Sequence, residues 1–214
     1  MRFRKIIPNT ITLINLFLGC CALAHIFKGD YEIAIKFVFL GLLSDFLDGY
    51  FARRLKVNSP LGKQLDSLAD MVTFGVIPGS IVFSILSHVS EDYNYLGMKY
   101  FYPYVGFFIT LMSALRLGRF NLDERQEYGF IGLNTPACTL FFVGILSIFQ
   151  NDSYGLAGWV SFPPILISLS LIFSYLLLAP LPMFSFKIKS GNRAGAEFKI
   201  LFVGLSLLLL VFWK

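Results

Sequence analysis

The chain of 214 residues is strongly hydrophobic and carries few charges. Of its residues 56% are hydrophobic, 17% are aromatic and only 14% are charged, and the net charge is +5 with a mean hydropathy of +0.70. About a quarter of the residues in a soluble domain are charged, so this composition excludes a water-soluble globule and a disordered chain. The long apolar runs predict membrane-spanning helices and not the short alternating strands of a membrane barrel.

Apolar segments of spanning length follow one another along the chain, separated by short polar breaks. The helices that they predict cover Ile11–Phe27, Tyr31–Leu55, Pro60–Ser87, Tyr100–Leu117, Gly132–Phe149, Pro163–Leu181 and Phe198–Trp213. The last segment is short for a spanning helix. The sequence therefore predicts an all-α, polytopic membrane helix bundle of six or seven transmembrane helices, folded as a single domain over residues 1–214.

The positions of the basic residues predict the orientation of this bundle. If the amino terminus is cytoplasmic, most of the 18 Lys and Arg residues fall in cytoplasmic stretches, as the positive-inside rule requires. The loops on the opposite side, at 28–30, 88–99 and 150–159, are poor in Lys and Arg. We therefore attribute the positive charge to membrane topology and to attraction of anionic lipids, and expect no nucleic-acid partner.

Acidic side chains occur inside the predicted membrane helices, where ionised groups are unfavourable. The second and third helices contain Asp45, Asp48, Asp66 and Asp70. An ionised aspartate near the middle of a bilayer costs about 2.5 to 3.5 kcal/mol on insertion scales, so these carboxylates need a compensating charge. Salt bridges within the bundle would supply it, and the basic residues near enough in sequence are Arg53, Arg54 and Lys63. Bound cations are the alternative.

Helical spacing brings these carboxylates toward one site. Asp45 and Asp48 are three residues apart, and Asp66 and Asp70 are four apart, so each pair shares one face of its helix. Residues 57–60 predict a tight turn, in which a serine caps the third helix and a proline begins it. The two helices then form an antiparallel hairpin, and at 1.5 Å per residue the carboxylates lie at matching depths in a cavity that opens to the cytoplasm.

Four carboxylates without a nearby His or Cys form a set of hard oxygen ligands. They suit Mg²⁺ or Mn²⁺, with Ca²⁺ as a third candidate, and do not suit zinc. Two divalent cations held there would polarise phosphoryl oxygens and stabilise an in-line displacement at phosphorus. Gly49 and Ala52 leave room for a ligand on the same helix face, and Arg53 is suited to bind phosphate oxygens.

The spacing of these residues resembles a known motif. The segment Asp45-Phe-Leu-Asp48-Gly49-Tyr-Phe-Ala52-Arg53, followed by Gly62, Asp66 and Asp70, agrees at every fixed position with D-x2-D-G-x2-A-R-x8-G-x3-D-x3-D. This pattern is the signature of the CDP-alcohol phosphatidyltransferases. The resemblance implies that a CDP-linked lipid is cleaved at its diphosphate while an alcohol displaces CMP, and it implies a homodimer.

The resemblance also implies roles for the motif residues. The four aspartates would bind the metals, and Asp70 would in addition accept the proton of the alcohol hydroxyl. Gly49 and Ala52 would admit the cytidine nucleotide, Arg53 would contact the diphosphate, and Gly62 would allow close approach of the nucleotide or of a helix. Ordinary small-residue helix packing would also explain the two glycines and the alanine.

Other segments bear on the identity of the alcohol. Residues 8–15 resemble the amino-terminal segment of many members of this family. Residues 116–121 and 130–137 resemble segments of its phosphatidylserine synthases, with departures at Gly118 and Asn134. Serine brings a carboxylate, which Arg116 or Arg119 would bind, with Asn121 as a further polar contact. Anchoring at the cytoplasmic surface explains the two arginines equally well.

These observations predict a membrane enzyme that transfers the phosphatidyl group of CDP-diacylglycerol to the hydroxyl of L-serine and releases CMP. Its active site would face the cytoplasm in the cell (inner) membrane, in contact with membrane lipids. Within the same family, the alternative is another acceptor such as glycerol 3-phosphate or an inositol phosphate. Outside it, the alternative is an ion or proton transporter, since transporters also hold carboxylates inside a helix bundle.

Overall fold

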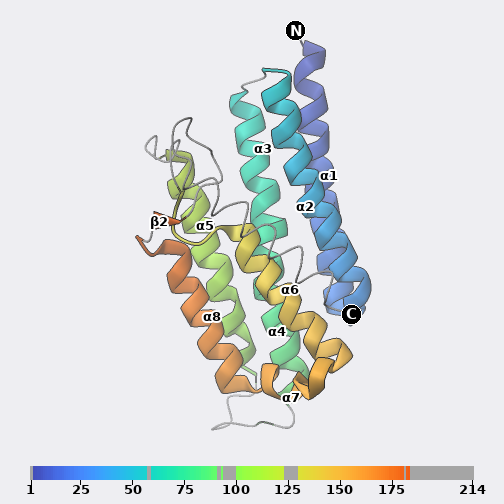
Figure 1. The fold of residues 1–214 in the computed structure, drawn as a ribbon, viewed down its shortest axis with the longest axis vertical. Helices are drawn as coiled ribbons and strands as arrows, with labels where there is room; N and C mark the ends of the chain where they lie inside the picture. The colour runs from blue at the N-terminus through green and yellow to red at the C-terminus, as the bar shows by residue number, and fades with distance from the viewer. Residues whose placement is uncertain are drawn as a thin grey trace, which may run out of the picture.

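The apolar segments fold as helices, because a backbone surrounded by hydrocarbon must satisfy its polar groups within the segment. The computed structural model describes residues 2–56, 59–90, 93, 100–122, 130–180 and 182–183. Over these residues the architecture is all-α, as predicted, apart from two strands of two residues each (Figure 1). The predicted helix Phe198–Trp213 lies outside the described residues.

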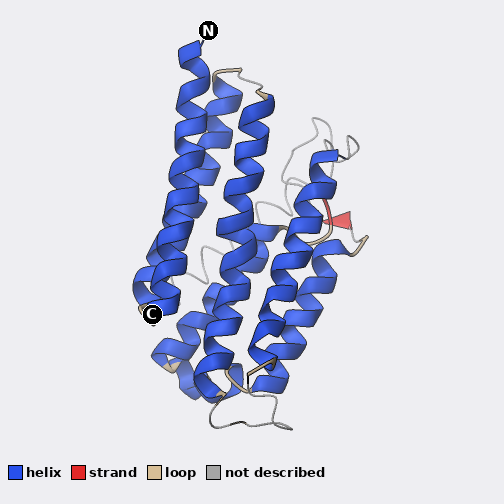
Figure 2. Ribbon diagram, turned by 180° about the vertical axis from the view of Figure 1, so that it is seen from behind, coloured by secondary structure: helices blue, strands red, loops and turns tan. Residues whose placement is uncertain are grey.

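The first three helices run side by side along one flank of the molecule (Figure 1 and Figure 2). They are α1 (Arg2–Lys28), α2 (Tyr31–Arg54) and α3 (Pro60–Asp70). Helix α1 packs against both α2 and α3. The predicted start of the first helix at Ile11 is wrong, because an apolar run marks only the part suited to hydrocarbon. The helix itself continues toward the amino terminus through Pro8 into polar sequence.

The turn between α2 and α3 has the predicted capping residues. The Ser59 hydroxyl oxygen accepts a hydrogen bond from the Gly62 N–H at 3.4 Å, and Pro60 is the first residue of α3. The proline needs no N–H partner at this position, and its fixed φ suits the first helical turn. Helix α3, which carries Asp66 and Asp70, therefore begins where the sequence predicts.

The third predicted helix, Pro60–Ser87, is continuous but not uniform. A π-helical segment, η1 (Met71–Val76), begins directly after Asp70 and leads into α4 (Ile77–Val89). Pro78 explains the irregularity, because it has no N–H to donate to the carbonyl of Phe74, four residues earlier, and its ring crowds that carbonyl. The expectation of one regular helix is corrected on this point.

The second half of the chain forms a further group of helices that packs around α4. It comprises η3 (Tyr102–Gly106), α5 (Phe107–Leu122), α6 (Thr135–Asn151), η5 (Ser153–Gly155), α7 (Ala157–Val160) and α8 (Pro163–Leu178). These elements confirm the fourth to sixth predicted helices with shifted ends. The start predicted at Tyr100 becomes the short 3-10 turn of η3, and α5 continues beyond the predicted Leu117. The end of α5 after Leu117 is helical although its sequence is polar.

The core lies along α4. Its residues Ile77, Ile81 and Ile85 follow one another at four-residue steps and are fully buried. Large apolar side chains such as Phe17 on α1 and Phe46 on α2 are exposed instead. Two helical stretches, Ile6–Lys28 and Pro60–Val89, are long and apolar enough to cross a membrane, and α6 and α8 are shorter apolar helices. Outward apolar residues on such helices suit contact with lipid chains.

A short β pairing fixes the start of α6 against the end of α8. Strands β1 (Phe130–Ile131) and β2 (Pro182–Met183) pair antiparallel. Gly132 then turns with φ of +80°, and a Cβ at this position would lie 2.6 Å from the carbonyl oxygen of Leu177. Only glycine suits both this conformation and this approach. The turn brings the first residue of α6, Thr135, into the interior.

Candidate active site

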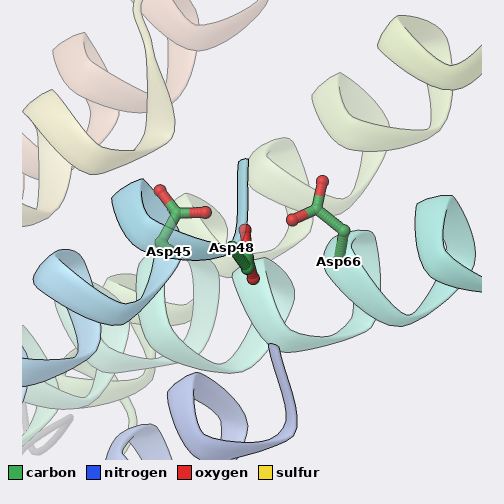
Figure 3. A group of neighbouring side chains, drawn as sticks. All are labelled: Asp45, Asp48 and Asp66. Carbon is green, nitrogen blue, oxygen red and sulfur yellow. The ribbon is translucent and has the colours of Figure 1, made fainter. Parts of the chain in front are cut away.

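Two aspartates of α2 and one of α3 meet inside the bundle. Carboxylate oxygens of Asp45, Asp48 and Asp66 all lie within 4.8 Å of one another. Figure 3 shows Asp45 and Asp66 rising from their two helices, with Asp48 between them in that view. The helical period places Asp45 and Asp48 on one face of α2, and the reversal at Ser59 turns the Asp66 face of α3 toward them.

The fourth aspartate lies at the side of this group. Asp70 lies near enough to Asp45, Asp66 and Asp48 to interact with each of them electrostatically. It does not belong to the set of three within 4.8 Å. Its Oδ1 atom is buried and has no hydrogen-bond partner among the described residues. Asp70 is the last residue of α3, so the π-helical segment η1 begins immediately after it.

No described basic side chain forms a salt bridge with these carboxylates, and Arg116 acts on Asp70 only through a longer-range electrostatic interaction. Within the described part of the chain, the ion pairs join His25 to Asp30 and Lys36 to Glu32, and none involves the four aspartates. Asp48, only 4% exposed, accepts a hydrogen bond from the Thr12 hydroxyl at 2.7 Å. Close carboxylates with a buried oxygen left unpartnered are suited to divalent cations with oxygen ligands, so this donor set fits the predicted metals.

A cavity of about 230 Å³ lies beside the three-carboxylate group. Its walls come from three helices and the turn that joins two of them, and the lining residues are Pro8, Asn9, Thr12, Asp48, Gly49, Ala52, Ser59, Gly62, Lys63 and Asp66. Small residues, hydroxyl and amide groups and one lysine line this cavity. Such a lining suits a polar, anionic ligand.

The motif residues predicted to bind the nucleotide lie around this cavity. Gly49, Ala52 and Gly62 line it directly. A Cβ at Gly62 would lie 3.1 Å from the Asn9 Oδ1 atom, so glycine permits α1 and α3 to come close there. Arg53 is exposed, and its Nη1 atom would lie 3.4 Å from a Cβ at Gly49. Its guanidinium therefore covers the Gly49 side of α2, next to the cavity.

The two arginines of α5 have different surroundings. Arg116 is 7% exposed, interacts electrostatically with Asp70, and directs Nη1 to the Thr135 hydroxyl at 3.5 Å. Its Nε atom has no hydrogen-bond partner in the described structure. Arg119 is exposed instead. Burial next to Asp70 places Arg116, and not Arg119, beside the acidic cluster.

Asn121 lies at the contact between α5 and α3. Its Nδ2 atom donates to the Ser67 hydroxyl at 2.7 Å, and its backbone carbonyl oxygen accepts from Lys63 Nζ at 3.0 Å. With both groups engaged in joining two helices, Asn121 serves as a helix contact in this structure.

Helix α1 contributes to the site, which the helical spacing of the aspartates does not reveal. Thr12 binds an aspartate and lines the cavity, together with Pro8 and Asn9. Lys63, considered only as a salt-bridge partner, is a cavity residue as well. The sequence contains a signal for α1, because residues 8–15 resemble the amino-terminal segment of the same family, but periodicity within α2 and α3 cannot supply it.

Comparisons with known proteins identify the family of this chain. Residues 5–185 match the family described as CDP-alcohol phosphatidyltransferase. A CDP-diacylglycerol–serine O-phosphatidyltransferase of Bacillus subtilis is 30% identical over 186 residues, which cover 85% of this chain and 91% of that protein. A protein of the same name from Helicobacter pylori is 32% identical, over 69% of this chain and 59% of its own length. An archaetidylserine synthase of Methanothermobacter thermautotrophicus is 30% identical, over 63% of this chain and 54% of its own length. The chain belongs to the CDP-alcohol phosphatidyltransferase family.

Proposed function

We propose that this protein transfers the phosphatidyl group from CDP-diacylglycerol to the hydroxyl of L-serine, giving phosphatidylserine and CMP. The observation that carries the proposal is a cluster of carboxylates with no salt bridge to any described basic side chain, beside a polar cavity, in a chain similar along most of its length to proteins named for this reaction. Residues 1–214 would act as a single catalytic domain.

In this proposal Asp45, Asp48, Asp66 and Asp70 hold two divalent cations, Mg²⁺ or Mn²⁺, with Ca²⁺ as a further candidate. Such cations would supply Lewis acidity and stabilise negative charge at the reacting phosphate. Thr12 orients Asp48 through its hydrogen bond, which fixes the carboxylate before any ligand binds.

The remaining motif residues would hold the nucleotide end of the lipid. Gly49, Ala52 and Gly62 leave the cavity wide enough for the cytidine nucleotide, and Arg53 and Lys63 bring positive charge to its rim. The acyl chains would stay in the bilayer beside the exposed apolar faces of the helices. Serine, being water-soluble, would enter from the aqueous side.

The chemical step is a displacement at the phosphorus that carries diacylglycerol. The serine oxygen forms the new bond to phosphorus, the bond from that phosphorus to the oxygen of CMP breaks, and CMP leaves with the electron pair. Asp70 accepts the hydroxyl proton, for which its unpartnered Oδ1 atom is available. Arg53 stabilises the charge that develops on the departing phosphate.

Arg116 is the residue that we propose to bind the serine carboxylate. It is buried beside Asp70 with an unpartnered Nε atom, so a carboxylate bound there would bring the serine hydroxyl close to the proposed base. Arg119 is exposed three residues later and fits membrane-surface anchoring better. Asn121, whose amide nitrogen donates to Ser67, stays a further polar contact for serine in this proposal.

The location of the enzyme is also part of the proposal. The apolar segments favour a bundle of six or seven spans, and the basic residues favour a cytoplasmic amino terminus, with the site open to the cytoplasm at the cell (inner) membrane. Contacts with anionic lipids and a homodimer follow from the positive cytoplasmic surface and from the family.

The deciding experiment offers the purified protein CDP-diacylglycerol with each acceptor in turn: L-serine, glycerol 3-phosphate and an inositol phosphate. We expect metal-dependent CMP release with serine alone. CMP release with a phosphorylated acceptor only would replace serine and keep the chemistry. An ion or proton transporter would release no CMP in detergent, so metal-dependent CMP release excludes transport as the main activity.

A further inference from the structure

The π-helical segment η1 is held by hydroxyl groups of the helices around it. Thr110 on α5 donates from Oγ1 to the Gly75 carbonyl oxygen at 3.0 Å. The Oγ1 atom of Thr139 on α6 lies 3.0 Å from the Phe74 carbonyl oxygen and 3.0 Å from the Thr135 carbonyl oxygen. Its one hydroxyl hydrogen is shared between these two acceptors. Because Pro78 has no N–H for Phe74, the neighbouring helix supplies the donor that the backbone lacks.

A third threonine, Thr73 on η1 itself, attaches the segment to α1. Thr73 is fully buried, and its Oγ1 atom donates to the Asn15 Oδ1 atom of α1 at 2.9 Å. A Cβ at Gly19 would lie 2.5 Å from that Oγ1 atom, and a Cβ at Gly41 of α2 would lie 3.0 Å from the Thr73 methyl carbon. Glycines on α1 and α2 thus leave room for the threonine. In all, η1 contacts four helices, namely α1, α2, α5 and α6.

The turn begins directly after Asp70, so its shape bears on the direction of that side chain. Beyond η1, the buried face of α4 is fixed in the core by Ile77, Ile81 and Ile85. A π-helical turn holds more residues than an α-helical turn, so it changes the angle between the faces of the helices on either side. With α4 fixed, a change of η1 to a regular turn would rotate Asp70 and Asp66 about the axis of α3.

We propose that Thr73, Thr110 and Thr139 are positioning residues, which keep η1 in its π-helical form and so orient the Asp70 carboxylate toward Asp45. In the described hydrogen bonds none of their hydroxyls contacts a carboxylate of the cluster, so they act through the backbone. The inference rests on the proposed metal site and names residues that the family motif does not contain.

Replacing Thr110 tests the inference most directly, because its hydroxyl has a single acceptor in the described structure. The Thr110→Val variant keeps the shape of the side chain and removes the donor. We expect the Mn²⁺ dissociation constant of the purified protein without substrate, measured by electron paramagnetic resonance, to rise about fivefold. We expect kcat to fall about tenfold with the KM for CDP-diacylglycerol unchanged, and Thr110→Ser to restore both values.

Two further variants separate positioning from general stability. Ser170→Ala removes a buried hydroxyl that bonds the Leu166 carbonyl at 2.7 Å within α8, far along the chain from η1. It should leave Mn²⁺ binding at the wild-type level even if it lowers the melting temperature. Thr139→Val should weaken Mn²⁺ binding in the same direction as Thr110→Val, and it serves as the test if Thr110→Val does not fold.

The outcomes distinguish this inference from the proposed function. Folded Val variants that bind Mn²⁺ and turn over like the wild type would overturn the positioning role. Failure of Thr110→Ser to rescue would overturn it too, because packing and not the hydroxyl would then be responsible. If the wild type releases no CMP but Mn²⁺ binding is weakened by Val and restored by Ser, the positioning role stands and the proposed reaction fails.

Discussion

Arg116 and Arg119 are three residues apart, yet the structure gives them different environments. Arg116 is buried against Asp70 and Thr135, whereas Arg119 is exposed. A buried guanidinium with a free donor is suited to bind a carboxylate, because an ionic hydrogen bond is strongest away from water. Exposed arginines contribute far less to binding.

This difference makes Arg116 and Arg119 a matched pair for the serine site. Arg116→Ala should raise the KM for serine by about tenfold or more, because it removes a charged partner of the carboxylate. Arg119→Ala should change that KM by less than about twofold. Steady-state kinetics at saturating CDP-diacylglycerol measures both, and equal serine KM values in the two variants would refute the assignment.

The proposed base can be tested by the smallest possible change. Asp70→Asn keeps the size of the side chain but cannot accept the hydroxyl proton, and it weakens the proposed metal site. We expect kcat to fall by about 10² to 10⁴, measured as CMP release. Glu32→Gln, at an exposed position that pairs with Lys36 on α2, is the control and should keep wild-type activity. Substantial turnover by Asp70→Asn would remove Asp70 from the mechanism.

At the scale of elements, short backbone features fix the helices that carry the site. The turn at Gly132 connects β1 to α6, and the N–H of the next residue, Leu133, donates to the Leu176 carbonyl at 2.9 Å. This attaches the start of α6 to the end of α8 and keeps Thr135 opposite Arg116. The hydrogen bond from Arg116, the proposed serine-binding residue, to Thr135 thus depends on a turn outside the signature motif of the family.

A pair of glycine substitutions tests this turn. Gly132→Ala places a Cβ 2.6 Å from the Leu177 carbonyl oxygen at a φ of +80°, and we expect it to destabilise the protein by about 1 to 3 kcal/mol. Gly144→Ala, inside α6 with nothing within 4 Å, should instead be neutral or stabilise by up to about 1 kcal/mol. Thermal unfolding in detergent measures the difference, and equal melting temperatures would contradict this view of the turn.

At the scale of the whole molecule, cations bound by the clustered carboxylates would couple metal binding to the stability of the bundle. The cluster draws on α2 and α3, and α1 supports it through Thr12. A cation that binds the folded protein would reduce the repulsion among these groups and join the helices that contribute them. Loss of the cation should therefore affect both activity and unfolding.

Chelation tests this link. Removal of divalent cations should abolish CMP release, and Mg²⁺ or Mn²⁺ should restore it. A cation at 100 times its dissociation constant should raise the free energy of unfolding by about 2.7 kcal/mol, measured from thermal unfolding with and without chelator. The Asp66→Asn variant should lose most of this stabilisation. Equal stabilisation of Asp66→Asn and the wild type would place the cation elsewhere.

The orientation in the membrane is a second property of the whole molecule. Lys56, two residues after the end of α2, is on the proposed cytoplasmic side, and Gly155, between α6 and α7, is on the proposed opposite side. In intact cells a membrane-impermeant maleimide should label Gly155→Cys and not Lys56→Cys, while permeabilised cells should show both. The wild-type chain, with Cys20, Cys21 and Cys138, gives the background. The reverse labelling pattern would invert the proposed topology.

The sequence by itself determined the features that depend on local spacing. The four-residue step from Asp66 to Asp70 and the capping by Ser59 follow from helix geometry, so both were predictable. The motif that identifies the family is of the same local kind. The π-helical segment before Pro78 was not predicted, because a proline inside a helix removes a donor without fixing how the backbone adapts, and Pro8 lies within the α-helix α1.

The tertiary structure decided which helices face one another. It placed Thr12 of α1 against Asp48, set Asp70 to the side of the other three aspartates, and buried Arg116 while leaving Arg119 exposed. Helical periodicity defines the faces of one helix but not the partner of each face. That choice depends on how side chains from distant parts of the chain fill the space between helices, which no local pattern contains.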